Sequence, residues 1–574
     1  MTFRAPVKDL VLALRSVGHA DLVARAFPDL DEATVEAVLE AAGAFVDAEL
    51  APLNRVGDQK GATYANGRVT AAPGFAEAYR QFAAQGWNSL AADPAYGGQG
   101  LPKALELAVF EMVQAANMAF GLCPMLTQGA VEALTLHGTE RQRRLILPRL
   151  VSGEWTGTMN LTEPQAGSDL AAITTRATPD GKGGYLLNGQ KIFITWGDHD
   201  AADNICHLVL ARLPDAPPGV KGISLFLATK RLVDDEGRLG APNSLRPASI
   251  EHKLGIHASP TCVMLFEDAQ AELVGNLNEG LAHMFVMMNA ARIHVGVQGV
   301  GIAERAFQQA LAYAQDRRQG RAAWASDGAI IGHPDVRRML VLSRAKISAA
   351  RCLCLLTGVM ADLAHRAPDE GERARARARQ ELLTPIAKAW STDLGVEVAS
   401  IGVQIHGGMG FIEETGAAQH LRDARIAPIY EGTNGIQALD LIGRKVSLDG
   451  GQAMGELIAD MRGFASELVD HDGLGDVGRR LQDACGSLEA ATSWILANRG
   501  VPAQAAATTY AQLAGDVIGG WLLGRQARLS GDEARLGLAR VYATQVLSRA
   551  GGLAAAISAG DTDLEALDAA ALAL

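Results

Sequence analysis

The hydrophobic period of this sequence changes along the chain, and this change limits the possible folds more than any other feature. Apolar residues recur at helical spacing up to about residue 155, follow short alternating runs to about residue 275, and return to helical spacing from Gly280 onwards. A chain of 574 residues is also too long for a single hydrophobic core. We therefore expect a multidomain α+β protein with its strands confined to the middle of the chain.

Residues 1–155 predict an N-terminal α-helical domain with an N-terminal extension. Helical spacing covers residues 29–50, 74–85, 104–117, 126–136 and 141–151. Residues 156–275 instead predict a middle β-domain. Short runs such as Lys191–Thr195 and His207–Leu213 are separated there by clusters of Gly, Pro and Asp. This pattern is typical of an antiparallel β-barrel or sandwich.

Two more helical regions follow the β-domain. Residues 276–446 contain long segments with helical spacing, which predict a C-terminal helical domain. The run Ser447–Gly451 is a turn-rich linker. The Ala- and Leu-rich residues 452–574 keep helical spacing and predict an additional C-terminal helical domain.

Composition and charge exclude several classes of partner. The formal net charge of −12 argues against nucleic acid or an anionic membrane surface as the main partner. No eighteen apolar residues follow one another without interruption, so we expect no integral membrane segment. The six cysteines are scattered, which favours structural thiols in a reduced, cytoplasmic compartment. His294 and His406 have no second ligand at metal spacing, so no metal site is expected.

Two clusters carry residues suited to holding a planar cofactor. The loop Met159–Leu170 brings backbone N–H groups and hydroxyls together, and these can donate hydrogen bonds to a flavin or to a phosphate. A plain turn between domains is an equally good interpretation of its composition. The segment Lys191–Gly197 carries two aromatic residues and a hydroxyl, which suits packing against a flavin edge. Its composition alone favours an ordinary core strand.

A third cluster, Arg422–Gly435, contains one carboxylate in an apolar setting. Glu431 follows Ile429 and Tyr430 and precedes Gly432, so its carboxylate can lie in an apolar pocket on a bendable backbone. Burial would raise its pKa towards the range in which it accepts a proton from carbon. A lone glutamate on a loop is usually a solvated surface group, and spacing alone does not favour catalysis here.

In this order, and between helical regions, the three clusters resemble the acyl-CoA dehydrogenase family. Its pattern Thr-Glu-Pro-x-Ala-Gly-Ser-Asp is complete at Thr162–Asp169, and its Ile-Tyr-Glu-Gly-Thr is complete at Ile429–Thr433. Its Lys-x-aromatic-Ile-Thr strand is present at Lys191–Thr195, and its Gln-x-x-Gly-Gly-x-Gly turn at Gln404–Gly410. The resemblance covers residues 35–446. The opening residues and the helical tail further resemble a longer subgroup, often labelled 3-methylmercaptopropionyl-CoA dehydrogenase-like.

The resemblance implies both a fold and a reaction. It makes residues 276–446 a four-helix-bundle domain and the protein an FAD-dependent flavoenzyme of fatty acid metabolism. Glu431 would abstract the α-proton of an acyl-CoA thioester while hydride passes from the β-carbon to FAD N5, which yields the trans-2-enoyl-CoA. Electrons would pass on to an electron-transfer flavoprotein. The implied substrate is 3-methylthiopropionyl-CoA or a fatty acyl-CoA.

Further site residues are implied position by position. The cofactor-binding positions are Met159, Leu161, Thr162, Phe193, Thr195, Arg317, Gln319, Gln404, Gly408 and Thr433, with Arg317 and Gln319 reaching the FAD pyrophosphate across a subunit contact. The substrate-binding positions are Ser168, Arg292, Tyr430 and Gly432. Three residues depart from the family pattern. His406 replaces an apolar or aromatic residue, Gly320 stands where many members carry Phe, and Phe193 stands where many carry Trp.

Alternatives to this function share parts of the same machinery. An acyl-CoA oxidase would use the same base and flavin but pass electrons to oxygen. A non-catalytic acyl-CoA-binding protein is a second alternative, which the intact Glu431 disfavours. The glycine-rich run Gly296–Gly301 does not follow a strand in a βαβ unit, so it is not a nucleotide loop. The additional helical domain would cover the surface through which shorter members form dimers of dimers, so we expect a homodimer.

Overall fold

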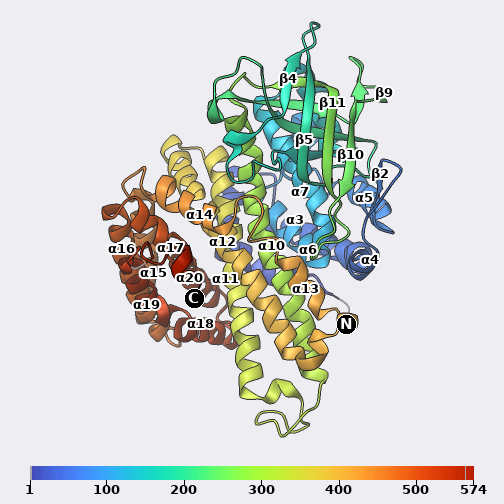
Figure 1. The fold of residues 1–574 in the computed structure, drawn as a ribbon. Coiled ribbons are helices and arrows are strands. Elements are labelled where there is room, and N and C mark those ends of the chain that lie inside the picture. The colour runs from blue at the N-terminus through green and yellow to red at the C-terminus, as the bar shows by residue number, and fades with distance from the viewer. Residues whose placement is uncertain (1–2, 563, 574) are drawn as a thin grey trace.

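The computed structural model describes residues 3–562 and 564–573, and its elements follow the predicted order along the chain (Figure 1). The β-domain lies at one end of the molecule, and long helices extend from it towards the opposite end. The additional helices cover one side of these long helices. The predicted multidomain α+β fold class is therefore confirmed.

The N-terminal region is helical, as its spacing predicts, with two differences in the bounds. Its helices are α1 (Val7–Ser16), α2 (His19–Ala26), α3 (Glu32–Phe45), α4 (Leu53–Lys60), α5 (Phe75–Ala84), α6 (Lys103–Ala116), α7 (Met118–His137), α8 (Glu140–Leu145) and α9 (Leu147–Ser152). The helix expected at 126–136 begins earlier, because the Asn117 side chain caps it by accepting from the Phe120 N–H, and it continues through Pro124. The helix expected at 141–151 is broken near Pro148, which lacks an N–H.

The middle region forms a mixed sheet, whereas the sequence predicts a purely antiparallel one. The seven strands are β3 (Trp155–Asn160), β4 (Arg176–Pro179), β5 (Tyr185–Thr195), β6 (Asn204–Arg212), β7 (Ile223–Thr229), β10 (Leu245–Ile250) and β11 (Thr261–Val274). Most pairings are antiparallel, but β3 runs parallel to β6, with Trp155 opposite Asn204. The chain forms β4 and β5 before it returns to pair β6 with β3, so this pairing is a crossover that local alternation cannot reveal. Two short hairpins lie outside this sheet. One pairs β1 (Thr63–Ala65) with β2 (Arg68–Thr70), and the other pairs β8 (Arg231–Val233) with β9 (Leu239–Pro242).

Three long helices form the axis of the third region. They are α10 (Gly280–Asp316), α11 (Pro334–Arg366) and α12 (Glu370–His406), followed by the short α13 (Ala417–Ala424) and α14 (Asn434–Asp440). The chain reverses direction twice, so α10 and α12 run parallel. Gly299 allows their backbones to approach closely, because a Cβ there would lie 2.2 Å from the Ser391 carbonyl oxygen. The glycine-rich run at 296–301 therefore packs two helices together.

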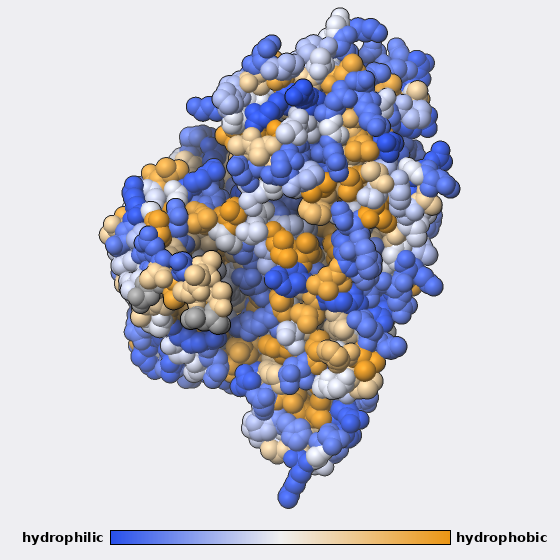
Figure 2. Space-filling view, in the orientation of Figure 1, coloured by the Kyte–Doolittle hydropathy of each residue, from blue (hydrophilic) through white to orange (hydrophobic). Residues whose placement is uncertain are grey.

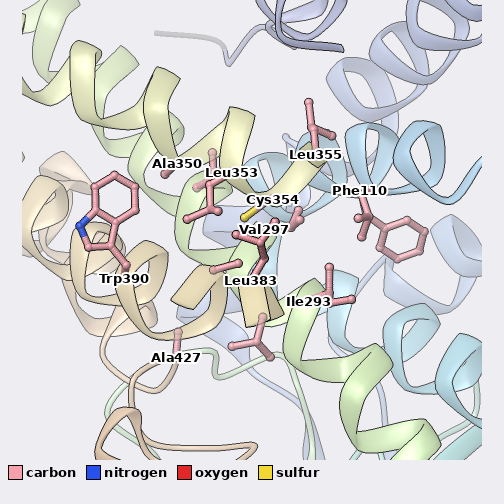
Figure 3. Packing of buried hydrophobic residues seen from close by; sticks show 14 of the residues in the cluster. Phe110, Ile293, Val297, Ala350, Leu353, Cys354, Leu355, Leu383, Trp390 and Ala427 are labelled. Atoms are coloured by element: carbon pink, nitrogen blue, oxygen red, sulfur yellow. The ribbon is translucent and has the colours of Figure 1, made fainter. Parts of the chain in front are cut away.

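Apolar side chains gather over these long helices on the face shown in Figure 2. Beneath that surface, Phe110 of α6, Ile293 and Val297 of α10, and Leu353 of α11 pack into one buried cluster (Figure 3). In the part of the chain that the structure describes, α11 is the one helix long and apolar enough to cross a membrane. Because 89% of its most apolar window is buried inside the protein, its composition follows from its place in this core.

The last region packs against the bundle through α17. Its helices are α15 (Gln452–Val469), α16 (Gly475–Ala497), α17 (Val501–Ser530), α18 (Glu533–Gln545), α19 (Ala550–Ala559) and α20 (Ala569–Leu572). Trp390 of α12 lies in this contact, where its Nε1–H donates to Asp516 Oδ1 at 3.0 Å. A Cβ at Gly515 would lie 2.3 Å from the Trp390 ring, so glycine is needed for this approach.

A buried group of charges joins three of the four regions. Arg351 of α11 is 1% exposed and binds Glu111 of α6 at 2.5 Å and Glu304 of α10 at 2.9 Å. Arg344 pairs with Glu304 and with Asp9 of α1, and Asp9 also pairs with Arg535 of α18. The negative charge of each buried carboxylate is therefore balanced by a guanidinium from another helix.

Replacing Arg351 with Met should destabilise the protein strongly. The change keeps much of the side-chain volume but leaves the buried Glu111 carboxylate without its cation, which typically costs about 3–5 kcal/mol. Thermal unfolding followed by circular dichroism at pH 7 measures the loss. As a control, Arg15→Met removes only exposed pairs with Glu32 and Glu36 and should cost at most about 1 kcal/mol. Equal effects of the two changes would contradict the structural role of Arg351.

Candidate active site

Glu431 lies on a sharply bent loop between α13 and α14. Its φ is +58° and that of Gly432 is +82°, so two successive residues adopt the left-handed region. That conformation suits glycine but costs a glutamate roughly 1–2 kcal/mol. The surrounding structure must therefore hold this bend in place.

Four hydrogen bonds hold the bend. The Tyr430 hydroxyl donates to Gln298 Oε1 of α10, and Gln437 Nε2 donates to the Glu431 carbonyl at 3.1 Å. From α12, Lys388 Nζ donates to the Gly432 carbonyl at 2.9 Å. The Asn434 N–H closes the turn by donating to the Pro428 carbonyl at 3.0 Å. Both long parallel helices therefore contribute to the position of Glu431.

The surroundings of Glu431 raise the pKa of its carboxyl group towards neutral pH. Burial raises its pKa to about 7, against the opposing charges of Arg292 and Lys388. Arg292 is 7% exposed, and its Nη1 donates to Asn289 Oδ1 at 3.1 Å and lies 3.5 Å from Asp440 Oδ2. A carboxylate with this pKa can both accept and release a proton near pH 7.

In the β-domain, the loop that contains Thr162 and the end of β5 that contains Phe193 together form a single edge. The Ile192 N–H donates to the Thr162 carbonyl at 2.9 Å, which joins the loop after β3 to the end of β5. Phe193 is 58% exposed and adopts a left-handed φ of +61°, so its ring is presented outwards. Thr162 and Thr195 are half-buried on the same edge, and Ser168 is exposed at the tip of the loop.

A buried ion pair behind this edge fixes the loop. Lys191 Nζ lies 2.8 Å from Glu163 Oε1, and both side chains are almost fully buried. Glu163 also accepts from the backbone and hydroxyl groups of Thr174 and Thr175. Although burial opposes the change, Lys191 and these donors lower the pKa of Glu163 to about 2. Glu163 is thus a constant anion that shapes the loop.

This edge fits the planar ring of a flavin. An exposed aromatic ring and two half-buried threonines lie together there, with Met159 and Leu161 beside them at the end of β3. A Cβ at Gly167 would meet no atom within 4 Å, so the loop leaves open space. Flat apolar surface bordered by hydroxyls and backbone N–H groups is what an isoalloxazine ring requires.

Helix α7 lies between the β-domain and α10, the helix that carries Arg292 and Gln298. A Cβ at Gly157 of β3 would lie 2.5 Å from the Ala130 Cβ of α7, and one at Gly129 would lie 2.9 Å from Met287 of α10. The β-domain, α7 and α10 are therefore in successive contact. Arg292, Tyr430 and Gly432, all predicted on the substrate side, lie with Glu431. Thr433 caps α14, where its hydroxyl accepts from the Ile436 N–H.

Four of the predicted cofactor residues lie far from Glu431 within one chain. Arg317 and Gln319 follow the end of α10, Gln404 lies in the last turn of α12, and Gly408 follows that helix. At 1.5 Å per residue, Arg317 is about 37 Å along α10 from Arg292. The parallel direction of α10 and α12 places these four residues together at one end of the bundle, away from the bend.

Two departures from the family pattern have local explanations at that end. His406 is buried and stacks on Tyr313 with ring centroids 4.4 Å apart, while its Nδ1–H donates to the Gly402 carbonyl at 2.7 Å. Its role in this chain is therefore to pack α12 on α10. Gly320 has a φ of +69°, a conformation that would strain a phenylalanine.

Several residues of the site were missed by the sequence-based reasoning. Lys388, Gln298 and Gln437 contact the Glu431 loop from positions far apart in the sequence, so no local motif groups them. One signal was available for Lys388, since a lysine within the largely apolar stretch 382–394 is unusual unless it is paired. Glu163 and Lys191 lay inside the predicted motifs, but spacing alone could not pair them.

Comparison with known families shows matches over most of the chain. Residues 32–154, 158–269 and 278–446 match the N-terminal, middle and C-terminal domains of acyl-CoA dehydrogenase. Residues 457–568 match a domain described as acetyl-CoA dehydrogenase C-terminal like.

Individual relatives extend over almost the whole length. A 3-methylmercaptopropionyl-CoA dehydrogenase from Ruegeria pomeroyi is 46% identical over 572 residues, which cover 95% of this chain and 96% of that protein. Among solved structures, ACDH-11 of Caenorhabditis elegans in complex with C11-CoA has a TM-score of 0.80 at 23% identity, covering 95% of this chain and 92% of that one. An acyl-CoA dehydrogenase complexed with FAD from Bacillus anthracis has a TM-score of 0.75 at 21% identity, covering 95% and 92%.

These two structures share the fold, and the matched domains together with the 46% identical relative show the family. The chain belongs to the acyl-CoA dehydrogenase family, whose members are FAD-dependent enzymes that act on acyl-CoA.

Proposed function

We propose that this enzyme oxidises an acyl-CoA thioester to the trans-2-enoyl-CoA, with Glu431 as the base that takes the α-proton. The observation that carries the proposal is the Glu431 loop, where burial raises the pKa of the carboxyl group to about 7 on a backbone held in the left-handed region. An α-C–H is a weak acid, so its base must be desolvated and precisely placed. Glu431 is partly buried and four hydrogen bonds hold its loop, which supports this assignment.

The edge formed by Met159, Leu161, Thr162, Phe193 and Thr195 would hold the flavin ring of FAD. When bound, FAD supplies the acceptor for the hydride that leaves the β-carbon of the substrate. The Thr162 and Thr195 hydroxyls and nearby backbone N–H groups would orient the ring, and Phe193 would cover part of it. The Lys191–Glu163 pair keeps this edge in shape, because it closes the loop from behind.

On the substrate side, the chain has to polarise the thioester carbonyl as the α-proton leaves. The backbone N–H of Glu431 is the expected donor to that carbonyl, since a preorganised N–H stabilises negative charge without reorganisation. Arg292, Tyr430 and Gly432 lie beside Glu431, and Ser168 at the tip of the flavin loop would meet the acyl-CoA. Arg317, Gln319, Gln404 and Gly408 would bind the outer part of an FAD held mainly by a second subunit.

The proposed physiological setting follows the resemblance. Electrons would leave the reduced enzyme to an electron-transfer flavoprotein, and the enzyme would act in the cytoplasm. The substrate we propose is 3-methylthiopropionyl-CoA, with a fatty acyl-CoA as the alternative. The relative from Ruegeria pomeroyi supports this choice, because its similarity extends over the additional domain as well.

Replacing Glu431 with Gln should abolish flavin reduction while leaving the cofactor bound. The amide has nearly the same size as the carboxyl group but cannot accept the α-proton, so the reductive rate should fall by about 10⁴-fold or more. Anaerobic stopped-flow absorbance at the flavin band measures the rate after acyl-CoA is added. The FAD content of the purified variant is the control for folding. Bleaching at the wild-type rate would place the base elsewhere.

A panel of acyl-CoAs tests the substrate. Propionyl-, butyryl-, 3-methylthiopropionyl-, octanoyl- and palmitoyl-CoA are compared by the second-order rate constant of flavin reduction. We expect 3-methylthiopropionyl-CoA to give the highest value and palmitoyl-CoA to give the lowest, because each methylene that the pocket cannot accommodate loses about tenfold or more. A maximum at octanoyl- or palmitoyl-CoA would contradict the substrate proposed here.

We also propose that the enzyme is a homodimer. The additional domain covers α11 and α12 through α17, which leaves less of the bundle for a second pair of subunits. The exposed Met409, Phe411 and Ile412 after α12 remain as apolar surface for one partner, with Phe411 87% exposed. Light scattering coupled to size-exclusion chromatography should give the mass of two chains. A mass of four chains would contradict it.

A further inference from the structure

Lys388 is a fully buried ammonium group in the middle of α12. Its Nζ donates to two oxygens of the loop that carries Glu431, the Gly432 carbonyl at 2.9 Å and Asn434 Oδ1 at 2.8 Å. A lysine is almost never buried to this extent unless it is paired. No motif assigned to the reaction includes it.

The contacts of Lys388 hold the bend directly against α12. Asn434, its second acceptor, donates from Nδ2 to the Ala389 carbonyl at 3.0 Å and to Asp393 Oδ1 at 2.8 Å. Lys388 and Asn434 therefore form one connection between the helix and the residues just after Glu431. Because Glu431 and Gly432 both have left-handed backbone, loss of this connection would allow the bend to relax.

The charge of Lys388 is not neutralised by a direct ion pair among the described residues, since both of its acceptors are uncharged oxygens. Arg292 of α10, the other cation facing Glu431, has Asp440 at 3.5 Å as a counter-ion, and Asp440 is shared with Arg444. Asp393 faces Lys388 from the same helix, although its carboxylate already accepts from Asn434. Burial lowers the pKa of Lys388 to about 7, and among the charges that oppose this change the Glu431 carboxylate favours the ammonium form most strongly.

We propose that Lys388 is a positioning residue for the reaction, which fixes the bend at Glu431 and favours the ionised form of the Glu431 carboxyl group against the effect of burial. The proposal rests on the function of Glu431 proposed above. The positive charge of Lys388 stabilises the charged form of the Glu431 carboxyl group, which is the form able to take the α-proton. The same ammonium holds the backbone on which that carboxylate stands, so one side chain sets both the place and the protonation state of the base.

The test compares two replacements by methionine at the same bend. Lys388→Met removes the charge and the hydrogen bonds while keeping the length of the side chain. Gln437→Met removes the hydrogen bond to the Glu431 carbonyl without changing any charge. The rate of flavin reduction by acyl-CoA is measured anaerobically from pH 5.5 to 9.5 on FAD-loaded protein.

In the wild-type enzyme the rate should rise with pH through an apparent pKa of about 7, because the base must lose its proton. With Lys388→Met the carboxylate loses a stabilising cation, so its pKa rises and the ascending limb should move up by about one pH unit or more. The plateau rate should also fall by about tenfold, because the bend relaxes. Gln437→Met should lower the plateau but leave the midpoint within about 0.3 units of wild type.

An unshifted midpoint in Lys388→Met would overturn the proposal and leave Lys388 a structural anchor. If that variant does not bind FAD, Lys388→Gln serves instead, since its amide can still donate to the Gly432 carbonyl but carries no charge. Lys388→Arg keeps the charge, and its midpoint should stay at or below that of wild type. Wild-type bleaching by Glu431→Gln would instead contradict the proposed function itself, independently of the result at Lys388.

Discussion

The buried charges around Arg351 form the interaction on which the rest of the structure depends. Its guanidinium joins α6 to α10 through Glu111 and Glu304, and Arg344 and Asp9 extend the group to the N-terminal extension and to α18. Burial alone would make both glutamates costly, so the helices are stable only in the arrangement that brings the arginines to them. Since α10 also carries Arg292 and Gln298, the same arrangement determines where the Glu431 loop can attach.

At the site itself, burial and positive charge act in opposite directions on one carboxyl group. Burial alone would keep Glu431 protonated, and direct pairing with a cation would make it too weak a base. Arg292 is already paired with Asp440, and Lys388 binds the backbone beside Glu431 instead of its carboxylate. Both cations therefore stabilise the carboxylate electrostatically, although neither forms a direct ion pair with it among the described residues. Such a balance accounts for its pKa of about 7.

The sequence was sufficient for the order of helical and strand regions, because hydrophobic period reflects burial locally. It pointed to Glu431 as a candidate base only through the resemblance, since a single loop carboxylate has no local signature. The parallel pairing of β3 with β6 was not predictable, because it depends on where the chain returns after β5. Lys388 was missed for a similar reason. Its partners, Gly432 and Asn434, lie more than forty residues away, and only the packing of α12 brings them together.

The left-handed backbone at Glu431 favours glycine over glutamate, so the residue found there is not the one that would make the loop most stable. A glutamate is strained in that conformation, and its carboxyl group is partly removed from water, whereas a glycine would have neither disadvantage. The bend would thus be more stable with glycine at position 431 than with glutamate. Selection for stability alone would favour glycine at this position, so the glutamate is expected to be kept for the proposed role of its carboxylate, while the hydrogen bonds of the loop hold the strained backbone.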